Sequence, residues 1–282
     1  MKLSSNKKFG LLLTLFLGFL GFWMTLNLTS QTNDNYILDV FAGLYGVVAL
    51  FGGLWGLHVA KGWGGLKSVI GKAVIMLSLG LLLQEFGQLS YAYYAVVKKT
   101  EIPYPSVGDV GYFGSVLLYI YAVLLINKAS GYKYNIKKLS SKAVAFLLPA
   151  VLLLGSYMYF LRGYSFDWSH PLTVLLDFGY PLGQTVYIAF AILAFLLSRK
   201  LLGGIMRGRI SLLIFALCAQ YAADFNFLFQ ASHETWTTAG YGDFMYLVSY
   251  TIMAMAILYM DVKGLEPSKN MSESMESSAE VK

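Results

Sequence analysis

Residues 10–26 read GLLLTLFLGFLGFWMTL, an apolar run without a single charged side chain. The run is longer than the hydrophobic core of a signal peptide, which spans about 7–15 residues, and no A-x-A cleavage site follows it. Because a helix rises about 1.5 Å per residue, a run of this length approaches the roughly 30 Å of a bilayer's hydrocarbon core. We therefore interpret it as an uncleaved transmembrane helix that follows Lys7 and Lys8.

The rest of the chain has the same apolar character. Of its 282 residues, 57% are hydrophobic and 13% are charged, whereas soluble domains carry about 25% charged residues. Apolar runs long enough to span a bilayer predict an all-α, polytopic transmembrane bundle of eight helices, forming one domain over residues 1–262. The predicted spans are residues 9–29, 36–59, 73–97, 109–127, 143–161, 172–198, 210–230 and 241–261.

The charges between these spans predict how the bundle is oriented. Lys and Arg cluster at the N-terminus and in three connections, at 60–72, 128–142 and 199–209. The alternate connections hold three basic residues, Lys98, Lys99 and Arg162. Since cytoplasmic loops carry the excess of Lys and Arg, both termini are expected in the cytoplasm, and the polar segment 263–282 is expected to be a disordered cytoplasmic tail. The net charge of +6 therefore reflects topology, and a nucleic-acid partner is excluded.

Four acidic residues recur at a regular spacing. Asp39, Asp109, Asp177 and Asp243 begin the four spans that run inwards, and they lie 70, 68 and 66 residues apart. In three of these spans, polar or aromatic residues follow the Asp on the same face of the helix. Tyr112 follows Asp109 in this way, and Tyr180 and Gln184 follow Asp177. The spacing predicts four hairpin-like repeats. The alternative is that Asp complements the dipole at each helix start and Tyr belongs to the interfacial belt.

Two further acids lie inside predicted spans. Glu85 is near the middle of the third span, beside Gln84 and Gln88, and Asp224 lies in the outer third of the seventh, near Asn226. A carboxylate at mid-bilayer costs about 2.5–3.5 kcal/mol on insertion scales, so such groups normally face the bundle interior or a wet cavity. Two interpretations stay open, an outward-facing polar cavity and a sealed hydrogen-bond network that fixes helix packing.

Glycine and proline patterns bear on helix continuity. Five glycines of the second span, Gly43, Gly46, Gly52, Gly53 and Gly56, are expected to permit close helix contact. Of the six prolines, only Pro149 and Pro181 fall inside predicted spans. The sequence therefore predicts few of the midplane helix breaks that transporters use.

The polar groups of the spans define a candidate ligand-binding or proton-relay site. Its residues are Glu85, Gln88, Asp109, Tyr112, Asp177, Tyr180, Gln184, Asp224 and Asn226. Counting the acids inside helices, acids outnumber bases ten to three on the outer side, so the field there is expected to concentrate cations, and tyrosine faces add cation–π contacts. The expected ligand is a small polar or cationic molecule, or protons. No catalytic residue, metal site or cofactor is predicted, because no mid-span lysine, paired intramembrane histidines, G-x-S-x-G, Walker A or C-x-x-C motif occurs.

Three stretches resemble a known family. Residues 102–113, IPYPSVGDVGYF, match a P-x-P-S-x-x-D-x-x-[YF] pattern, and residues 177–183, DFGYPLG, match D-x-x-Y-P-L-G, although the family often has Asp where Gln184 stands. The segment from Ala223-Asp224 to Gly242-Asp243-Phe244-Met245-Tyr246 is similar to the family's last helix pair. Over about residues 40–262 the chain thus resembles the N-terminal membrane sensor modules of prokaryotic GGDEF-type diguanylate cyclases and some histidine kinases. The resemblance implies a sensory module and supplies no catalytic residue. The family continues with a cyclase or kinase after its last helix, where the segment 263–282 stands here, so we expect a module without an output domain of its own.

Three functions follow as alternatives. The first is a stand-alone, receptor-like sensor in the cell membrane that passes a helix shift to a separate cytoplasmic or membrane signalling partner. The second is a proton-coupled small-molecule transporter with Glu85, Asp177 and Asp224 as the relay. The third is an intramembrane lipid enzyme, which the lack of any nucleophile–base or metal-ligand pattern disfavours. In all three, the lipid bilayer is a partner.

Overall fold

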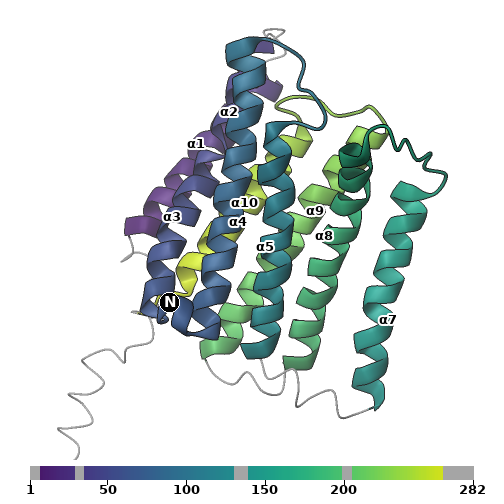
Figure 1. Cartoon of the computed structure of the whole chain (residues 1–282). Helices are drawn as coiled ribbons and strands as arrows, with labels where there is room; N and C mark the ends of the chain where they lie inside the picture. Colours follow the sequence, from purple (N-terminus) through teal and green to yellow (C-terminus); the bar gives the residue numbers. More distant parts are fainter. Residues whose placement is uncertain (1–6, 29–34, 130–138, 199–204, 263–282) are drawn as a thin grey trace, which may run out of the picture.

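The structure is a computed structural model, and it describes residues 7–28, 35–129, 139–198 and 205–262. Over these residues the chain forms helices that run alternately up and down one bundle (Figure 1). The α-helices are α1 (Lys7–Leu28), α2 (Asn35–Leu44), α3 (Val47–Gly62), α4 (Val69–Ala92), α5 (Val107–Ala129), α7 (Leu139–Ser156), α8 (Pro171–Ser198), α9 (Ile205–Ser232) and α10 (Tyr241–Tyr259). A 3-10 turn, η2 (Gly65–Lys67), precedes α4, and two π-helical segments, η3 (Tyr93–Lys98) and η4 (Tyr157–Leu161), extend α4 and α7. The all-α prediction is confirmed for the described residues.

Seven of these helical stretches are long and apolar enough to cross a membrane. They are Lys7–Leu28, Tyr36–Gly62, Val69–Lys98, Val107–Ala129, Pro171–Leu196, Gly208–Ser232 and Tyr241–Tyr259. The remaining predicted span, 143–161, corresponds to α7 with η4, whose apolar stretch Phe146–Leu161 is shorter. Such lengths and compositions are those of a multi-pass membrane protein. The predicted tail, 263–282, lies outside the described residues.

The second span differs from the continuous helix expected over 36–59. α2 ends at Leu44 and α3 begins at Val47, with a turn at Tyr45 and Gly46 between them. The cause lies on a neighbouring helix, because the Gln88 side-chain Nε2 of α4 donates to the carbonyl oxygen of Ala42. In a regular helix that oxygen accepts from the amide of Gly46, and a side chain that inserts into the helical ladder kinks the helix. Gly46 keeps right-handed helical angles, φ −60° and ψ −18°, so the interruption is local and Tyr36–Gly62 remains one spanning stretch.

Small residues bring α3 close to both α4 and α10. A Cβ on Gly52 would lie 2.4 Å from the Cβ of Ala254 in α10, and one on Gly53 would lie 2.6 Å from Cγ of Leu82 in α4. Neither distance leaves room for a side chain, so these glycines set how closely the backbones approach. The expected role of the second-span glycines in close packing is confirmed.

Two helices lie at the periphery. α1 packs mainly on α10, whereas α7 packs on α8 at the opposite side of the bundle (Figure 1). The outward side chains of α7 are large and apolar, among them Phe146, Val151 and Leu154. Such a surface suits contact with lipid chains, since these are as apolar as the side chains themselves.

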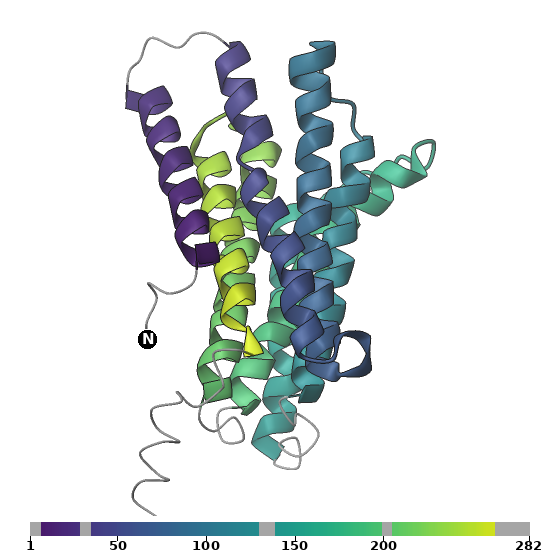
Figure 2. The ribbon, with the colours of Figure 1, turned by 90° about the vertical axis from the view of Figure 1, so that its left-hand side faces the viewer.

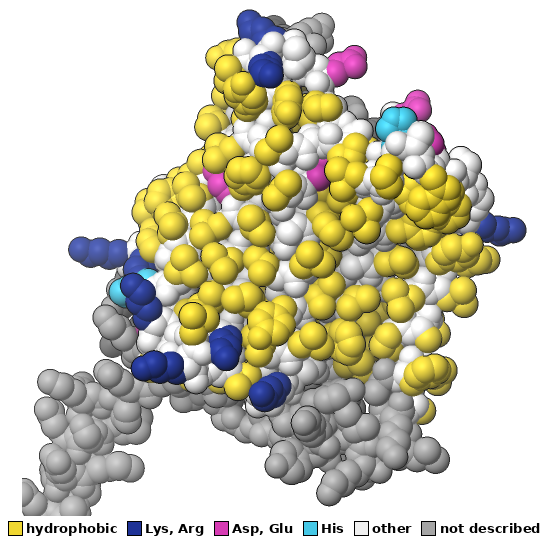
Figure 3. Space-filling view, viewed as in Figure 1, with side chains coloured by type: hydrophobic (Ala, Val, Ile, Leu, Met, Phe, Trp, Pro, Cys, Tyr) yellow, Lys and Arg dark blue, Asp and Glu magenta, His cyan; other side chains and the backbone are white. Residues whose placement is uncertain are grey.

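The two ends of the bundle differ in charge. The end that we call the basic end carries Lys61, Lys67, Lys72, Lys128 and Arg209. The opposite end, which we call the acidic end, carries Asp39, Glu101, Asp109, Asp167, Asp177, Glu234 and Asp243. Figure 3 shows a face with hydrophobic side chains over its middle, acidic groups in its upper part and basic groups along its lower edge. α1 begins and α10 ends toward the basic end (Figure 2).

Candidate functional site

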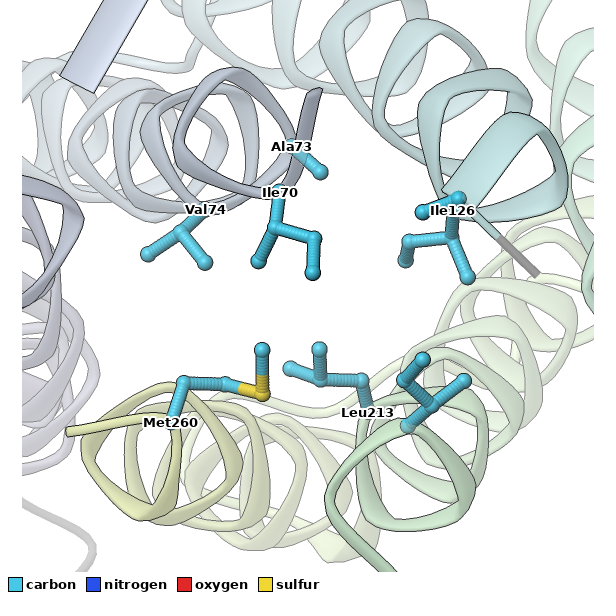
Figure 4. A pocket seen from close by; sticks show the side chains of 8 residues that line it. Ile70, Ala73, Val74, Ile126, Leu213 and Met260 are labelled. Atoms are coloured by element: carbon cyan, nitrogen blue, oxygen red, sulfur yellow. The ribbon is translucent and has the colours of Figure 1, made fainter. Parts of the chain in front are cut away.

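Two hollows of the described residues are lined by side chains other than the candidate residues. A small cavity near the basic end is formed by apolar side chains of α4, α5 and α9 and the end of α10 (Figure 4). Its lining residues are Ile70, Ala73, Val74, Ile126, Ala129, Ile210, Leu213 and Met260. An open cleft of about 550 Å³ lies at the acidic end, lined by Tyr36, Asp39, Ala95, Lys99, Thr100, Glu101 and Ile102. The predicted polar residues instead form hydrogen-bonded clusters between helices.

The most accessible cluster lies at the acidic end. Asp177 accepts hydrogen bonds from the hydroxyls of Tyr104, at 2.7 Å, and Tyr164, at 2.6 Å. Asp109 accepts from the hydroxyl of Tyr180, at 2.7 Å, and is also bonded by the backbone amide and the hydroxyl of Ser106. We call Tyr104, Asp109, Tyr164, Asp177 and Tyr180 the rim cluster. Both carboxylates are half-buried, and neither forms an ion pair with a described basic residue.

The tyrosines of the connecting loops remain hydrogen-bond donors at physiological pH. The bond from Tyr164 to Asp177 is the main reason that the pKa of Tyr164 is raised to about 12. Desolvation, followed by the bond to Asp177, raises the pKa of Tyr104 well above its ordinary value. A raised tyrosine pKa keeps the hydroxyl protonated until the solution is strongly alkaline. The negative charge of the rim cluster therefore resides on its two carboxylates.

Aromatic rings flank these carboxylates. Tyr164 packs on Phe178 with ring centroids 5.1 Å apart, and Phe178 stacks on Phe166 at 5.3 Å. Phe166 also stacks on Trp168 at 5.6 Å, and these two side chains are 53% and 70% exposed. Exposed aromatic faces beside an unpaired carboxylate are the two features that recognise organic cations.

A second cluster surrounds Asp224 inside the bundle. Its carboxylate accepts from the hydroxyls of Tyr187, at 2.8 Å, and Tyr246, at 3.1 Å, and from Nε2 of Gln220, at 2.9 Å. The hydroxyl of Ser249 in turn donates to Oε1 of Gln220 at 2.7 Å. Asp224 is only 4% exposed, so this carboxylate is satisfied by the chain itself and is closed off from the outside.

The middle of the bundle carries a chain of amides and hydroxyls. The hydroxyl of Tyr250 donates to Oε1 of Gln84 at 2.8 Å, and Nε2 of Gln84 donates to Oγ of Ser115 at 2.7 Å. One turn further, the hydroxyl of Tyr112 donates to Oε1 of Gln88 at 2.8 Å. Glu85 lies between these two glutamines, yet its Oε2 is buried without a hydrogen-bond partner.

These bonds join six helices into one closed network. Tyr45, between α2 and α3, donates to Asp243 of α10 at 3.1 Å. Asp224 of α9 accepts from Tyr246 of α10 and from Tyr187 of α8. Asp109 of α5 accepts from Tyr180 of α8. Gln88 of α4 accepts from Tyr112 of α5 and donates to Ala42 of α2. Because each link crosses between helices, the network fixes their relative positions. The interior clusters therefore resemble the sealed hydrogen-bond network more than the outward-facing cavity. The rim cluster is the exposed edge of this network.

The structure brings together some of the predicted residues and separates others. Gln88 pairs with Tyr112, and Asp109 with Tyr180, in each case across two helices. Glu85 and Asp224 do not share a hydrogen bond; the rings of Tyr246 and Tyr250, 5.8 Å apart, lie between their clusters. Among the described residues, Gln184 is buried in α8 without a bond to the other candidates, and Asn226 donates to Gln230 at 2.9 Å.

Several contributors were missed from the sequence, and three of them show why. Tyr104 and Tyr164, which hold Asp177, stand in loops where no helical periodicity marks them. Tyr104 lies inside the quoted P-x-P-S pattern, which was the one available signal. Tyr45 precedes a glycine in a glycine-rich span, and that dipeptide is the site of the helix break.

No metal site accompanies these clusters in the part of the chain that the structure describes. No group of three or more His, Cys, Asp or Glu side chains there is arranged to hold a metal ion. Comparison with protein-family models, curated proteins and solved structures gives no match to this chain. The resemblance to membrane sensor modules therefore stays an expectation.

Proposed function

We propose that the chain is a membrane sensor whose rim cluster binds a small organic cation at the acidic end. One observation carries the proposal: Asp109 and Asp177 are half-buried, bonded by tyrosine hydroxyls from other segments, and unpaired with any described basic residue. Two such carboxylates attract positive charge, and the exposed ring of Trp168, at the end of the aromatic stack, offers a face for it.

Binding at this place would change contacts between helices. A cation beside Asp177 offsets the negative charge that strengthens the hydrogen bonds from Tyr104 and Tyr164, so these bonds weaken when it binds. Tyr180, next along the cluster, connects α8 to α5 through Asp109. Since a ligand shifts an equilibrium only by its different affinity for the two states, the weakening of these bonds in the bound state is the required difference.

The route to the other end runs through α10. α8 and α10 share Asp224 through Tyr187 and Tyr246. At the basic end, Nε1 of Trp63 donates to the carbonyl of Met260 at 2.6 Å, and Nη1 of Arg209 donates to the carbonyl of Asp261 at 3.0 Å. A shift of α10 therefore changes contacts to α3 and α9, and a separate signalling partner at this end would detect it.

The proposal is tested by thermal unfolding of the purified protein in detergent. Replacing KCl by tetramethylammonium chloride at constant ionic strength should raise the Tm of wild type by roughly 2–4 °C for each kcal/mol of binding. The Asp177→Asn variant should lose most of this shift, because the charge that holds the cation is gone.

The matched control is Glu234→Gln. Glu234 is an exposed carboxylate of the same end, in the connection between α9 and α10. This control should keep the full tetramethylammonium shift. Equal shifts in wild type, Asp177→Asn and Glu234→Gln would overturn the rim cluster as the binding site.

A second candidate, a cation-coupled transporter, is favoured by one observation. The second span is interrupted at Tyr45 and Gly46, and discontinuous membrane helices are where transporters bind their ions. Uptake of a labelled solute into proteoliposomes under an imposed cation gradient would support transport, whereas ligand-dependent unfolding without uptake would support the sensor.

A further inference from the structure

A buried carboxylate faces the break between α2 and α3. Glu85 stands near the middle of the span Val69–Lys98 and is 3% exposed, and its Oε2 has no hydrogen-bond partner. A Cβ built on Gly46 would lie 2.1 Å from this oxygen. The carboxylate therefore occupies the space that the missing side chain of Gly46 leaves at the turn.

The polar groups at the turn bond to one another and not to Glu85. Nε2 of Gln88 donates to the carbonyl of Ala42, and the hydroxyl of Tyr112 donates to Oε1 of Gln88. Glu85 thus lies among polar groups whose hydrogen bonds are already made, and none of them donates to its Oε2.

Among the described residues, no basic side chain reaches Glu85. The titratable groups around it are Tyr112 of α5, Tyr250 of α10 and Tyr45 beside Gly46, and the hydroxyls of all three donate to other groups. Asp243 is the acceptor of Tyr45 and adds a further acidic group nearby. An ionised carboxylate buried without a partner is strongly unfavourable, so protonation is the remaining way to stabilise it.

We infer that Glu85, packed against the turn at Gly46, is a proton-binding site inside the bundle. The tight packing decides the ligand, because Oε2 of Glu85 and Cγ of Gln88 would stand 2.1 Å and 3.0 Å from a Cβ on Gly46 and leave no space for a metal or organic ion. A proton needs no such space, and one proton neutralises the one carboxylate. The site is separate from the rim cluster and does not depend on the sensor proposal.

The test compares wild type with Glu85→Gln, the neutral isostere, by thermal unfolding in detergent. At pH 8.5 in KCl, wild type should unfold at least roughly 2–4 °C below Glu85→Gln, because only wild type holds an unpaired buried charge. In the sodium arm, NaCl replaces KCl at pH 8.5. In the proton arm, the pH falls to 5.5 in KCl. Closure of the gap in the proton arm alone supports the proton site, and closure in the sodium arm would overturn it in favour of a metal-ion site.

Two further variants make the result decisive. Glu101→Gln carries the same change at an exposed carboxylate, and it should respond to both arms as wild type does. Gly46→Ala keeps Glu85 but places a Cβ where its Oε2 lies, so the stabilisation by the proton should shrink. If wild type, Glu85→Gln and Gly46→Ala respond alike in both arms, the proton site is overturned; the tetramethylammonium test of the rim cluster is unaffected by that result.

Discussion

At the scale of single residues, the neighbouring tyrosines Tyr119 and Tyr187 differ in whether the hydroxyl has a hydrogen-bond partner. Both side chains are fully buried, and their rings meet edge to face with centroids 5.9 Å apart. The hydroxyl of Tyr187 donates to Asp224 at 2.8 Å, whereas that of Tyr119 has no partner. The pair therefore separates the effect of a made hydrogen bond from that of an unmade one.

We expect opposite results from the same substitution at these two positions. Tyr187→Phe should lower the free energy of unfolding by about 0.6–2 kcal/mol, because it removes a bond to a carboxylate within the membrane. Tyr119→Phe should leave it unchanged or raise it by about 1 kcal/mol, because a buried hydroxyl without a partner disappears. The measurement is denaturant or thermal unfolding in detergent.

Tyr121→Phe provides the control for ring chemistry alone, since Tyr121 is exposed on α5 and its change should be near neutral. Equal destabilisation by Tyr119→Phe and Tyr187→Phe would contradict the contacts described for Tyr119.

At the scale of elements, the packing of α3 depends on residues without side chains. A Cβ on Gly52 would lie 2.4 Å from the Cβ and 3.1 Å from the Cα of Ala254. The second of these is a backbone atom, so α3 and α10 must move apart to accept it. We expect Gly52→Ala to lower the free energy of unfolding by about 1–3 kcal/mol, the usual cost of overpacking.

Gly18→Ala is the matched variant for this prediction. A Cβ on Gly18 in α1 meets nothing within 4 Å, and Ala favours a helix over Gly by about 1 kcal/mol. Unfolding should therefore show Gly18→Ala as neutral or stabilising. A Gly52→Ala protein as stable as wild type would mean that α3 and α10 are not as close as described.

The same element shows where sequence-based prediction stops. Apolar length alone predicted the span that holds α2 and α3, because a bilayer demands that length whatever the neighbours are. The break at Tyr45 and Gly46 depends on Gln88, which belongs to another helix, and no pattern within the span contains that information. Hydropathy is a local property of the chain, whereas the continuity of this helix is decided by a tertiary contact.

In the candidate site, too, local patterns were predictable from the sequence and contacts between helices were not. The spacing of Asp109 and Asp177 with Tyr112 and Tyr180 marked polar stripes that do lie between helices. Their partners were not predictable, because each tyrosine donates to a group on another helix and not along its own stripe. Asp177 is held by two loop tyrosines, and loops carry no periodicity from which their position could be inferred.

At the scale of the whole molecule, the charge asymmetry of the bundle predicts its orientation in the membrane. The basic end, with Lys61, Lys67, Lys72, Lys128 and Arg209, should face the cytoplasm. α7 is the helix on which this prediction turns, because its described apolar stretch, Phe146–Leu161, is shorter than the other spans. With 18 residues in α7 and 5 in η4, the element extends over roughly 30 Å and is long enough to cross.

We therefore expect α7 to span the bilayer and both termini to be cytoplasmic. A reporter that is active only in the cytoplasm should give signal when fused after Lys282, and one that is active only after export should give signal when inserted within residues 163–169. The insertion lies between α7 and α8, so it changes sides if α7 does not cross. A silent export reporter beside an active cytoplasmic one would show that α7 lies on the membrane surface, and a silent cytoplasmic reporter would show that the charge asymmetry does not set the orientation.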